Sequence, residues 1–352
     1  MISLQNILSR VRRGGRSDVV GLDVGEMTTK IVRLKRVGGA ITVVAADLLP
    51  RLAPPALDVA DVRPEPLTVA RELQGRHAAI AVSTPHASIR LLTIPGSHEN
   101  VEQLNFSELL GVPEGVEYRI GYEVLTADSR AEQTVLAAGM PLAHARWAAA
   151  LLPRGLPAPC SLQVGGVAAL NSMGAGVGDL RGETTVLSVH LGTEVTHVAA
   201  FHRGRLALFR QCLIGNQTIV KIVRERLGIE EELVPGILDD SVIDVSQAIG
   251  VAIEPFLRQL MLAREFVERK RTCHIERILL CGSLLGTKHW MAHIEATTGI
   301  RPEVWNPFAG LPVAAGALTD RVKGVESRFT GAVGAALAAL ENPRDLPHRP
   351  AA

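Results

Sequence analysis

Residues 19–34 read VVGLDVGEMTTKIVRL, and this stretch decides the fold because a variant of it returns at residues 186–201 as VLSVHLGTEVTHVAAF. Each copy has two runs rich in aliphatic and β-branched residues around a turn that carries glycine and threonine, which is the pattern of a β-hairpin. Self-similarity at a fixed offset is a property of a whole fold rather than of one turn. The chain is therefore predicted to contain two related halves. The positions that align are Gly25 with Gly192, Thr29 with Thr196, and Asp23 with His190.

The two turns have the chemistry of phosphate loops. Backbone N–H groups converge in a turn of this kind, and glycine lets a phosphate approach the backbone closely. Asp23 ends the first strand and is suited to hold Mg²⁺ through water, because Mg²⁺ favours carboxylates and retains its waters. Lys30 is not expected to reach a phosphate, since residues beyond the turn alternate between faces. The pair of turns predicts a nucleotide clamped between two domains; the alternative is two ordinary hairpins in a β-rich sheet.

Composition narrows the class of protein. A chain of 352 residues that is 47% hydrophobic can bury more than one core. A net charge of +1 and an aromatic content of 3% argue against nucleic-acid binding. The four cysteines have no C-x-x-C spacing, which fits reduced thiols, and charges interrupt each apolar run before it is long enough to span a bilayer. No signal peptide precedes Asp18, so we expect a soluble cytoplasmic protein without a nucleic-acid partner.

The first 17 residues form a basic leader with two interpretations. Its apolar residues share one helical face, so the leader is either a short helix on anionic lipid or a frayed segment on its own domain. The apolar residues are Leu4, Ile7, Leu8 and Val11, and the basic ones are Arg10, Arg12, Arg13 and Arg16.

Between and after the hairpins the sequence predicts a small α+β insert and several helices. Residues 86–152 contain short alternating pieces, among them a helix at 102–110 and a strand at 122–125. The glycine run at 174–178 follows a helix and leads into a strand, the reverse of the dinucleotide-binding order, so it is predicted to be a linker. Further predicted elements are strands at 40–46, 77–82, 134–138 and 277–281, and helices that start after 216 or cover 142–152, 246–270, 290–298 and 332–340.

Three motifs have structural explanations that we favour over chemistry. Residues 282–288 imitate a P-loop, but the spacing is one residue short and Thr precedes Lys, so a strand-to-helix turn over a nucleoside is the better interpretation. His289 and His293 have a metal-ligand spacing without a third ligand, which favours boundary histidines. Strand alternation does not place all three of His190, His197 and His202 on one face.

Taken together, these segments resemble the type IV pilus assembly protein PilM family, actin-like proteins related to the bacterial division protein FtsA. The resemblance runs from about residue 19 to residue 340 with its parts in the family's order. Its most specific element is the run TGIRPEVWNPF at 298–308. Residues 155–157 leading into 167–170 are similar to the helix that enters the family's second half.

The resemblance implies an α/β, actin-like (ASKHA, ribonuclease H-like) fold of duplicated domains around an interdomain cleft that holds ATP, with a small α+β insert. The implied domains are subdomain 1A at 18–85, 153–182 and 314–345, the insert 1C at 86–152, subdomain 2A at 183–215 and 256–313, subdomain 2B at 216–255, and a tail at 346–352. The implied nucleotide-binding residues are Asp23, Gly25, Thr28 and Thr29 in the first phosphate loop, Gly192, Thr193 and Thr196 in the second, Gly215 and Asn216 near the ribose and phosphates, and Gly282 and Ser283 under the adenosine.

The implied function is a cytoplasmic scaffold at the inner-membrane platform of a type IV pilus-like machine. Its implied partner is the cytoplasmic N-terminal segment of a PilN-like bitopic membrane protein, bound by the first domain and the insert; pilus motor ATPases and a second copy of the chain are further implied partners. The second phosphate loop of actin-like ATPases begins with Asp, and here His190 stands in that place, a poor substitute for a carboxylate around Mg²⁺. We therefore expect ATP as a structural ligand with little or no hydrolysis.

Two other functional classes stay open. An active ATPase or small-molecule kinase on the same fold needs a catalytic carboxylate, and Glu26 and Glu194 are the only acids inside the two turns apart from Asp23. An FtsA-like filament protein is the other class, which we disfavour because the residues after Asn342 are not amphipathic.

Overall fold

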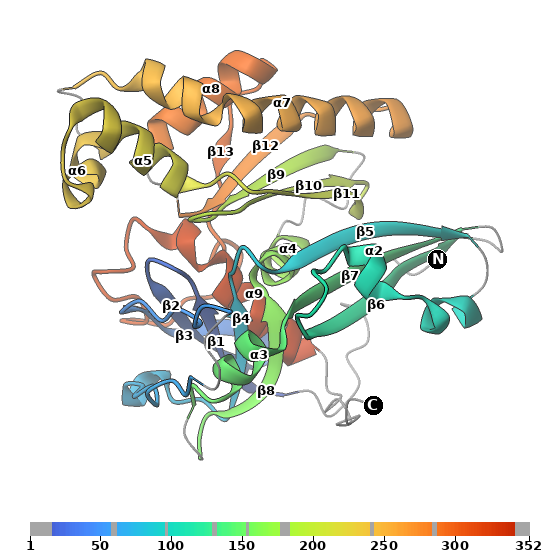
Figure 1. The fold of residues 1–352 in the computed structure, drawn as a ribbon. Coiled ribbons are helices and arrows are strands. Elements are labelled where there is room, and N and C mark those ends of the chain that lie inside the picture. The colour runs from blue at the N-terminus through green and yellow to red at the C-terminus, as the bar shows by residue number, and fades with distance from the viewer. Residues whose placement is uncertain are drawn as a thin grey trace.

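Two five-stranded sheets with the same strand order form the centre of the molecule (Figure 1). The computed structural model describes residues 16–57, 62–95, 98–128, 132–152, 155–176, 184–239, 243–283 and 287–341; most of the leader and the whole tail lie outside these residues. In each sheet three antiparallel strands come first and two parallel strands follow. The first sheet runs β3 (Ala40–Leu49), β2 (Thr29–Val37), β1 (Asp18–Val24), β4 (His77–Val82), β8 (Ala158–Val164); the second runs β11 (Arg205–Cys212), β10 (Thr196–His202), β9 (Thr185–Leu191), β12 (Arg277–Gly282), β13 (Glu303–Val304).

Core clusters cover both faces of the first sheet, and on one face the helices approach it very closely. Every residue of β1 is buried, as expected for a central strand covered on both faces. Helix α9 (Thr330–Glu341) packs on β1, and a Cβ at Gly21 would overlap the carbonyl oxygen of Ala332. Helix α4 (Gly165–Gly176) crosses α9 at Gly334, where a Cβ would overlap the carbonyl oxygen of Ala168. Small residues therefore set the distance between backbones in this layer.

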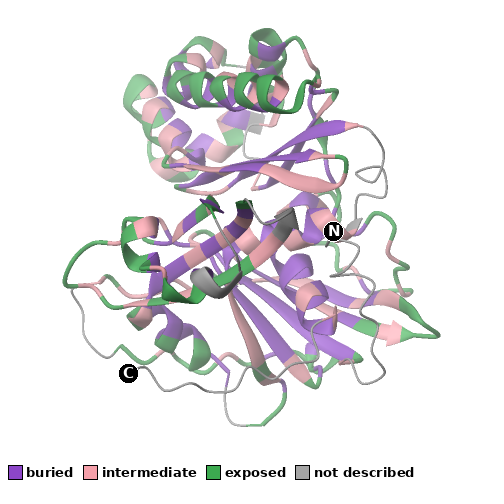
Figure 2. Ribbon diagram, turned by 90° about the vertical axis from the view of Figure 1, so that its right-hand side faces the viewer, coloured by how far each residue is buried: buried purple, intermediate pink, exposed green. Residues whose placement is uncertain are grey.

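The second sheet lies under a helical layer with its own core. The helices are α5 (Asn216–Leu227), α6 (Val234–Asp239), α7 (Ser246–Arg271) and α8 (Thr287–Thr298). Phe256 and Trp290 meet edge to face at 5.4 Å in the middle of this core, while α7 exposes its outer face (Figure 2). The long helix predicted at 246–270 is confirmed. It includes Pro255 at an exposed position, and the predicted 2A/2B boundary at 255/256 falls inside it.

The insert is a three-stranded sheet with helices, as the sequence predicted in outline. Its order is β5 (Ser88–Pro95), β7 (Glu132–Pro141), β6 (Tyr118–Asp128), with α2 (Phe106–Leu110) and α3 (Leu142–Ala149). The strand predicted at 122–125 is longer because it pairs along β7 over its full length. The helix predicted at 102–110 is interrupted at Asn105, whose side chain accepts a hydrogen bond from the Glu108 amide at 3.4 Å and starts a new helix.

Short 3₁₀ turns complete the described chain at Arg71–Leu73, His98–Gln103, Glu231–Leu233 and Glu326–Phe329. Within the described residues, none of the helices combines the length and the apolar character that crossing a membrane requires.

Candidate functional site

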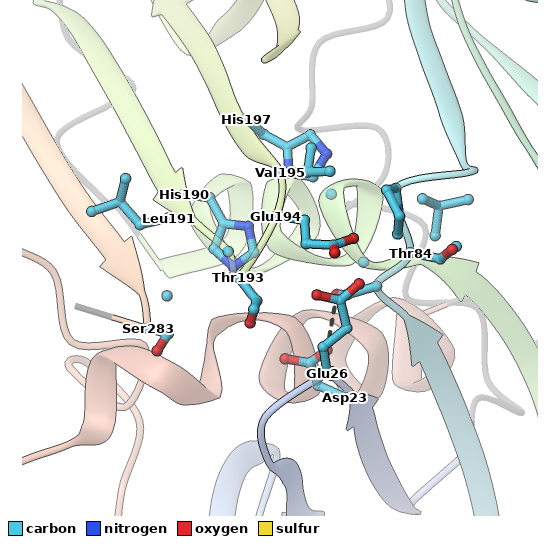
Figure 3. A pocket seen from close by; sticks show the side chains of 18 of the residues that line it. Asp23, Glu26, Thr84, His190, Leu191, Thr193, Glu194, Val195, His197 and Ser283 are labelled. Atoms are coloured by element: carbon cyan, nitrogen blue, oxygen red, sulfur yellow. Dashed lines mark hydrogen bonds between the residues drawn. The ribbon is translucent and has the colours of Figure 1, made fainter. Parts of the chain in front are cut away.

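The two aligned turns face each other across a small cleft between the two sheets (Figure 3). Its volume is about 50 Å³, room for a few water molecules. Six of the predicted nucleotide-binding residues line it, and five do not. The lining residues are Asp23, Gly25, Gly192, Thr193, Gly282 and Ser283; the others are Thr28, Thr29, Thr196, Gly215 and Asn216.

The first turn brings a lysine to the cleft that the alternation argument missed. Lys30 stands directly opposite Asp23 in the β1–β2 pairing, so the two side chains share a face of the sheet. The Lys30 ammonium lies 3.7 Å from one Asp23 oxygen, and the Ser83 hydroxyl donates to the other at 3.4 Å. A Cβ at Gly25 would come within 3.0 Å of the Lys30 side-chain nitrogen. Glycine at this position therefore leaves space for the lysine side chain. Lys30 is therefore a cleft residue.

The second turn contains a neutral imidazole where the first has a carboxylate. His190 is 8% exposed, and a Cβ at Gly282 would come within 3.1 Å of its Nε2. Its ring stacks at 5.8 Å on His197, its cross-strand partner. Burial, with the charge of Lys30 added, lowers the pKa of His190 to about 4, and burial beside His190 lowers the pKa of His197 to about 3. Both rings are therefore uncharged at neutral pH.

Asn216 holds the second turn in place. Its side-chain nitrogen donates to the carbonyl oxygens of Gly192, at 3.2 Å, and of Ser283. Its side-chain oxygen accepts from the buried Trp290 indole at 3.3 Å. The first backbone amides of α5 also bind this turn: the Asn216 N–H donates to the Gly192 carbonyl and the Gln217 N–H to the Thr193 carbonyl. These hydrogen bonds fix the second turn to α5 and to the end of β12. The predicted place of Gly215 and Asn216 near the ribose and phosphates stays a prediction.

Gly215, Thr196 and Thr29 have structural roles at the hairpins of the two sheets. Gly215 has no room for a side chain, since a Cβ would overlap the Thr193 carbonyl. Thr196 is fully buried and donates to the Ile214 carbonyl at 2.6 Å. Thr29 is fully buried at the start of β2. The aligned threonines thus shape the hairpins, whereas the aligned glycines Gly25 and Gly192 line the cleft.

Two glutamates occupy the gap between the turns. Glu26 comes from the first turn and Glu194 from the second, and Figure 3 shows their side chains directed toward each other. Burial raises the pKa of Glu26 to about 7, the charge and hydrogen bond of Glu194 add to the rise, and Arg51 opposes it. The sequence placed both residues in the turns but did not show that they meet.

A magnesium ion does not fit the side chains as they stand. Both oxygens of Asp23 already have partners, in Lys30 and Ser83. The corresponding position of the second turn offers a neutral imidazole, and Mg²⁺ favours oxygen ligands. Nowhere in the described part of the chain do three His, Cys, Asp or Glu side chains gather as a metal site.

The remaining histidine motifs make structural contacts, and the P-loop-like run lies partly outside the described residues. His289 and His293 on α8 both contact Ser246, through its hydroxyl at 3.4 Å and its carbonyl at 3.1 Å, and so hold the start of α7. His202 bonds the Thr185 hydroxyl at 2.8 Å, away from the His190–His197 stack. Gly282 ends β12 with φ +92°, and α8 begins at Thr287; the residues between 283 and 287 lie outside the described residues.

The chain is similar in structure to proteins of the actin-like fold. A chain of the PilM-PilN type IV pilus biogenesis complex matches it with a TM-score of 0.72 and 18% identity, over 92% of this chain and 99% of that one. A protein of unknown function with the actin-like ATPase fold from Bacteroides thetaiotaomicron matches with a TM-score of 0.46 and 11% identity, over 83% and 92%. Ethanolamine utilization protein EutJ from Carboxydothermus hydrogenoformans matches with 0.44 and 15%, over 95% and 97%.

No family model and no curated protein sequence matches the chain. The structural likeness, together with the repeated sheet order, confirms the predicted actin-like fold of duplicated domains.

Proposed function

We propose that this chain is a PilM-like scaffold of the actin-like fold, acting at the assembly platform of a type IV pilus-like machine. The observation that carries the proposal is the match to a chain of the PilM-PilN complex over nearly the whole of both chains. The partner is the cytoplasmic segment of a PilN-like bitopic membrane protein, and the chain works in the cytoplasm at the inner face of the membrane. Pilus motor ATPases and a second copy of the chain are further partners within this proposal.

ATP in this proposal is a structural ligand of the cleft. Lys30 and the glycine backbones of both turns are the groups that favour its phosphates. A ligand that binds only one form of a protein stabilises that form in proportion to the logarithm of its saturation, without turnover. The domain boundaries given from the sequence, including the division of the second half into 2A and 2B, belong to the same proposal.

Catalysis is disfavoured by the state of the acids that line the cleft. Asp23 is paired with Lys30, and Glu26 and Glu194 face one another. A carboxylate serves as a general base only when it is free to accept a proton within reach of the attacking oxygen. The described lining residues contain no further acid, so an ATPase or small-molecule kinase is the weaker alternative. An FtsA-like filament protein remains an alternative on the same fold.

ATP turnover separates the scaffold from the enzyme. We expect the purified chain to release phosphate from ATP no faster than the buffer. His190→Asp is expected to leave this result unchanged, because the substitution restores a carboxylate suited to Mg²⁺ but leaves the three acids of the cleft engaged as before. Phosphate release measured with a coupled assay checks both. Tight magnesium-dependent binding with multiple turnovers by the unsubstituted chain would contradict the scaffold proposal.

A further inference from the structure

Glu26 and Glu194 connect the two halves of the molecule at the cleft. Glu26 lies in the β1–β2 turn of the first half and Glu194 in the β9–β10 turn of the second. Figure 3 shows their carboxyl groups directed toward each other, and both residues line the cleft, whose volume is only about 50 Å³. A phosphate chain gripped by both turns must pass between them, where these side chains stand (Figure 3). We propose that the Glu26–Glu194 pair is a proton-linked latch that closes the cleft against phosphates.

The chemistry of the pair makes the latch depend on a proton. Two carboxyl groups bond to each other only when one of them is protonated, because two carboxylates in contact repel and neither can donate. The other charged or titratable groups described at this cleft do not offset the repulsion between the two carboxylates in the way that a shared proton does. Lys30 is paired with Asp23, His190 and His197 are uncharged, and Arg51 favours the ionised form of Glu26 without abolishing the rise in its pKa. Arg328 also lines the cleft, where it has interactions of its own.

The direction of the pH effect follows from the raised pKa of Glu26. Below its ordinary value of 4.5 the carboxyl is protonated in both the closed and the open form, and closure is fully favoured. Between 4.5 and about 7 only the closed form retains the proton, so closure weakens by at most about tenfold per pH unit. Above about 7 the pair is ionised and the effect is complete. The ionised pair then opposes incoming phosphates by its charge.

Amide hydrogen exchange of the cleft segments 83–87 and 192–195, without nucleotide, tests the latch. In the unsubstituted chain we expect protection, corrected for intrinsic exchange, to be higher at about pH 5 than at about pH 8. Glu26→Gln keeps a donor to Glu194 without titrating, so its protection is expected to be high and equal at both values. Glu26→Ala is expected to lose protection at both. Glu265→Gln, on the exposed face of α7, is the matched control and is expected to behave as the unsubstituted chain.

Protection that is independent of pH in the unsubstituted chain, or unchanged in Glu26→Ala, would overturn the latch. ATP titrations on the same proteins test the exclusion of phosphates, which rests on the proposed nucleotide site. We expect Glu26→Ala to bind ATP about tenfold more tightly, since a repelling carboxylate is removed. If the unsubstituted chain and Glu26→Ala bind ATP with equal affinity, the proposed exclusion of phosphates is wrong, and the latch itself is not affected. If neither protein binds ATP, both the exclusion of phosphates and the nucleotide part of the proposed function are wrong. The hydrogen-exchange data test closure of the cleft independently of ATP.

Discussion

Gly334→Val is expected to prevent the chain from folding. A side chain at this position would overlap the Ala168 carbonyl and come within 2.7 Å of the Ser172 amide, and both are backbone atoms of α4 that cannot move aside separately. Overpacking of a core commonly costs about 1–3 kcal/mol and more where the backbone must shift. Here α4 and α9 would separate, and α9 is also the helix that packs on β1. Since domains are stable by only about 5–15 kcal/mol, we expect no cooperative unfolding transition in circular dichroism.

Gly236→Ala is the control for this substitution. Gly236 lies in α6 with nothing within 4 Å of its would-be side chain. Alanine is the better helix former by about 1 kcal/mol, so this variant is expected to unfold at the same temperature or slightly higher. A Gly334→Val protein with the thermal midpoint of the unsubstituted chain would contradict the close α4–α9 contact.

Asn216→Ala is expected to destabilise the chain by about 2–4 kcal/mol. The substitution leaves the buried Trp290 indole without its acceptor, and it removes both donors that bind the Gly192 and Ser283 carbonyls. Each buried polar group left without a partner costs about 1–3 kcal/mol. Urea unfolding measures the loss.

Gln217→Ala, the next residue along α5, loses one partly buried hydrogen bond to Glu231 and is expected to cost about 1 kcal/mol or less. The pair also distinguishes a structural Asn216 from a nucleotide ligand. If Asn216→Ala left stability intact and weakened only ATP binding, the structural role assigned to Asn216 would be wrong.

The repeated hairpins made the fold predictable because their information is local. A glycine-bearing turn between two runs of aliphatic and β-branched residues can be recognised in a short window, and the same strand order then appears in both sheets. Strand β8 escaped prediction for a physical reason: Pro159 lies within it, and proline is tolerated in a strand only at a sheet edge, which sequence alone does not reveal.

The site was only partly predictable because its contacts join distant residues. Lys30 lies on the cleft through its cross-strand register with Asp23, which alternation alone does not give. Asn216 was expected at the nucleotide, but its side chain is taken up by the second turn and Trp290. Glu26 and Glu194 lie in different halves of the chain, so only the folded molecule shows that they meet.

The role as a platform scaffold is tested most directly by binding of a peptide. The peptide is the cytoplasmic N-terminal segment of the proposed PilN-like bitopic membrane protein. It is titrated into the full chain in a calorimeter, with a scrambled peptide as control. We predict saturable binding at one peptide per chain, with no phosphate released when ATP is present. If the peptide gives no heat of binding and the same preparation turns over ATP steadily, the scaffold proposal is contradicted and an active ATPase or kinase is favoured.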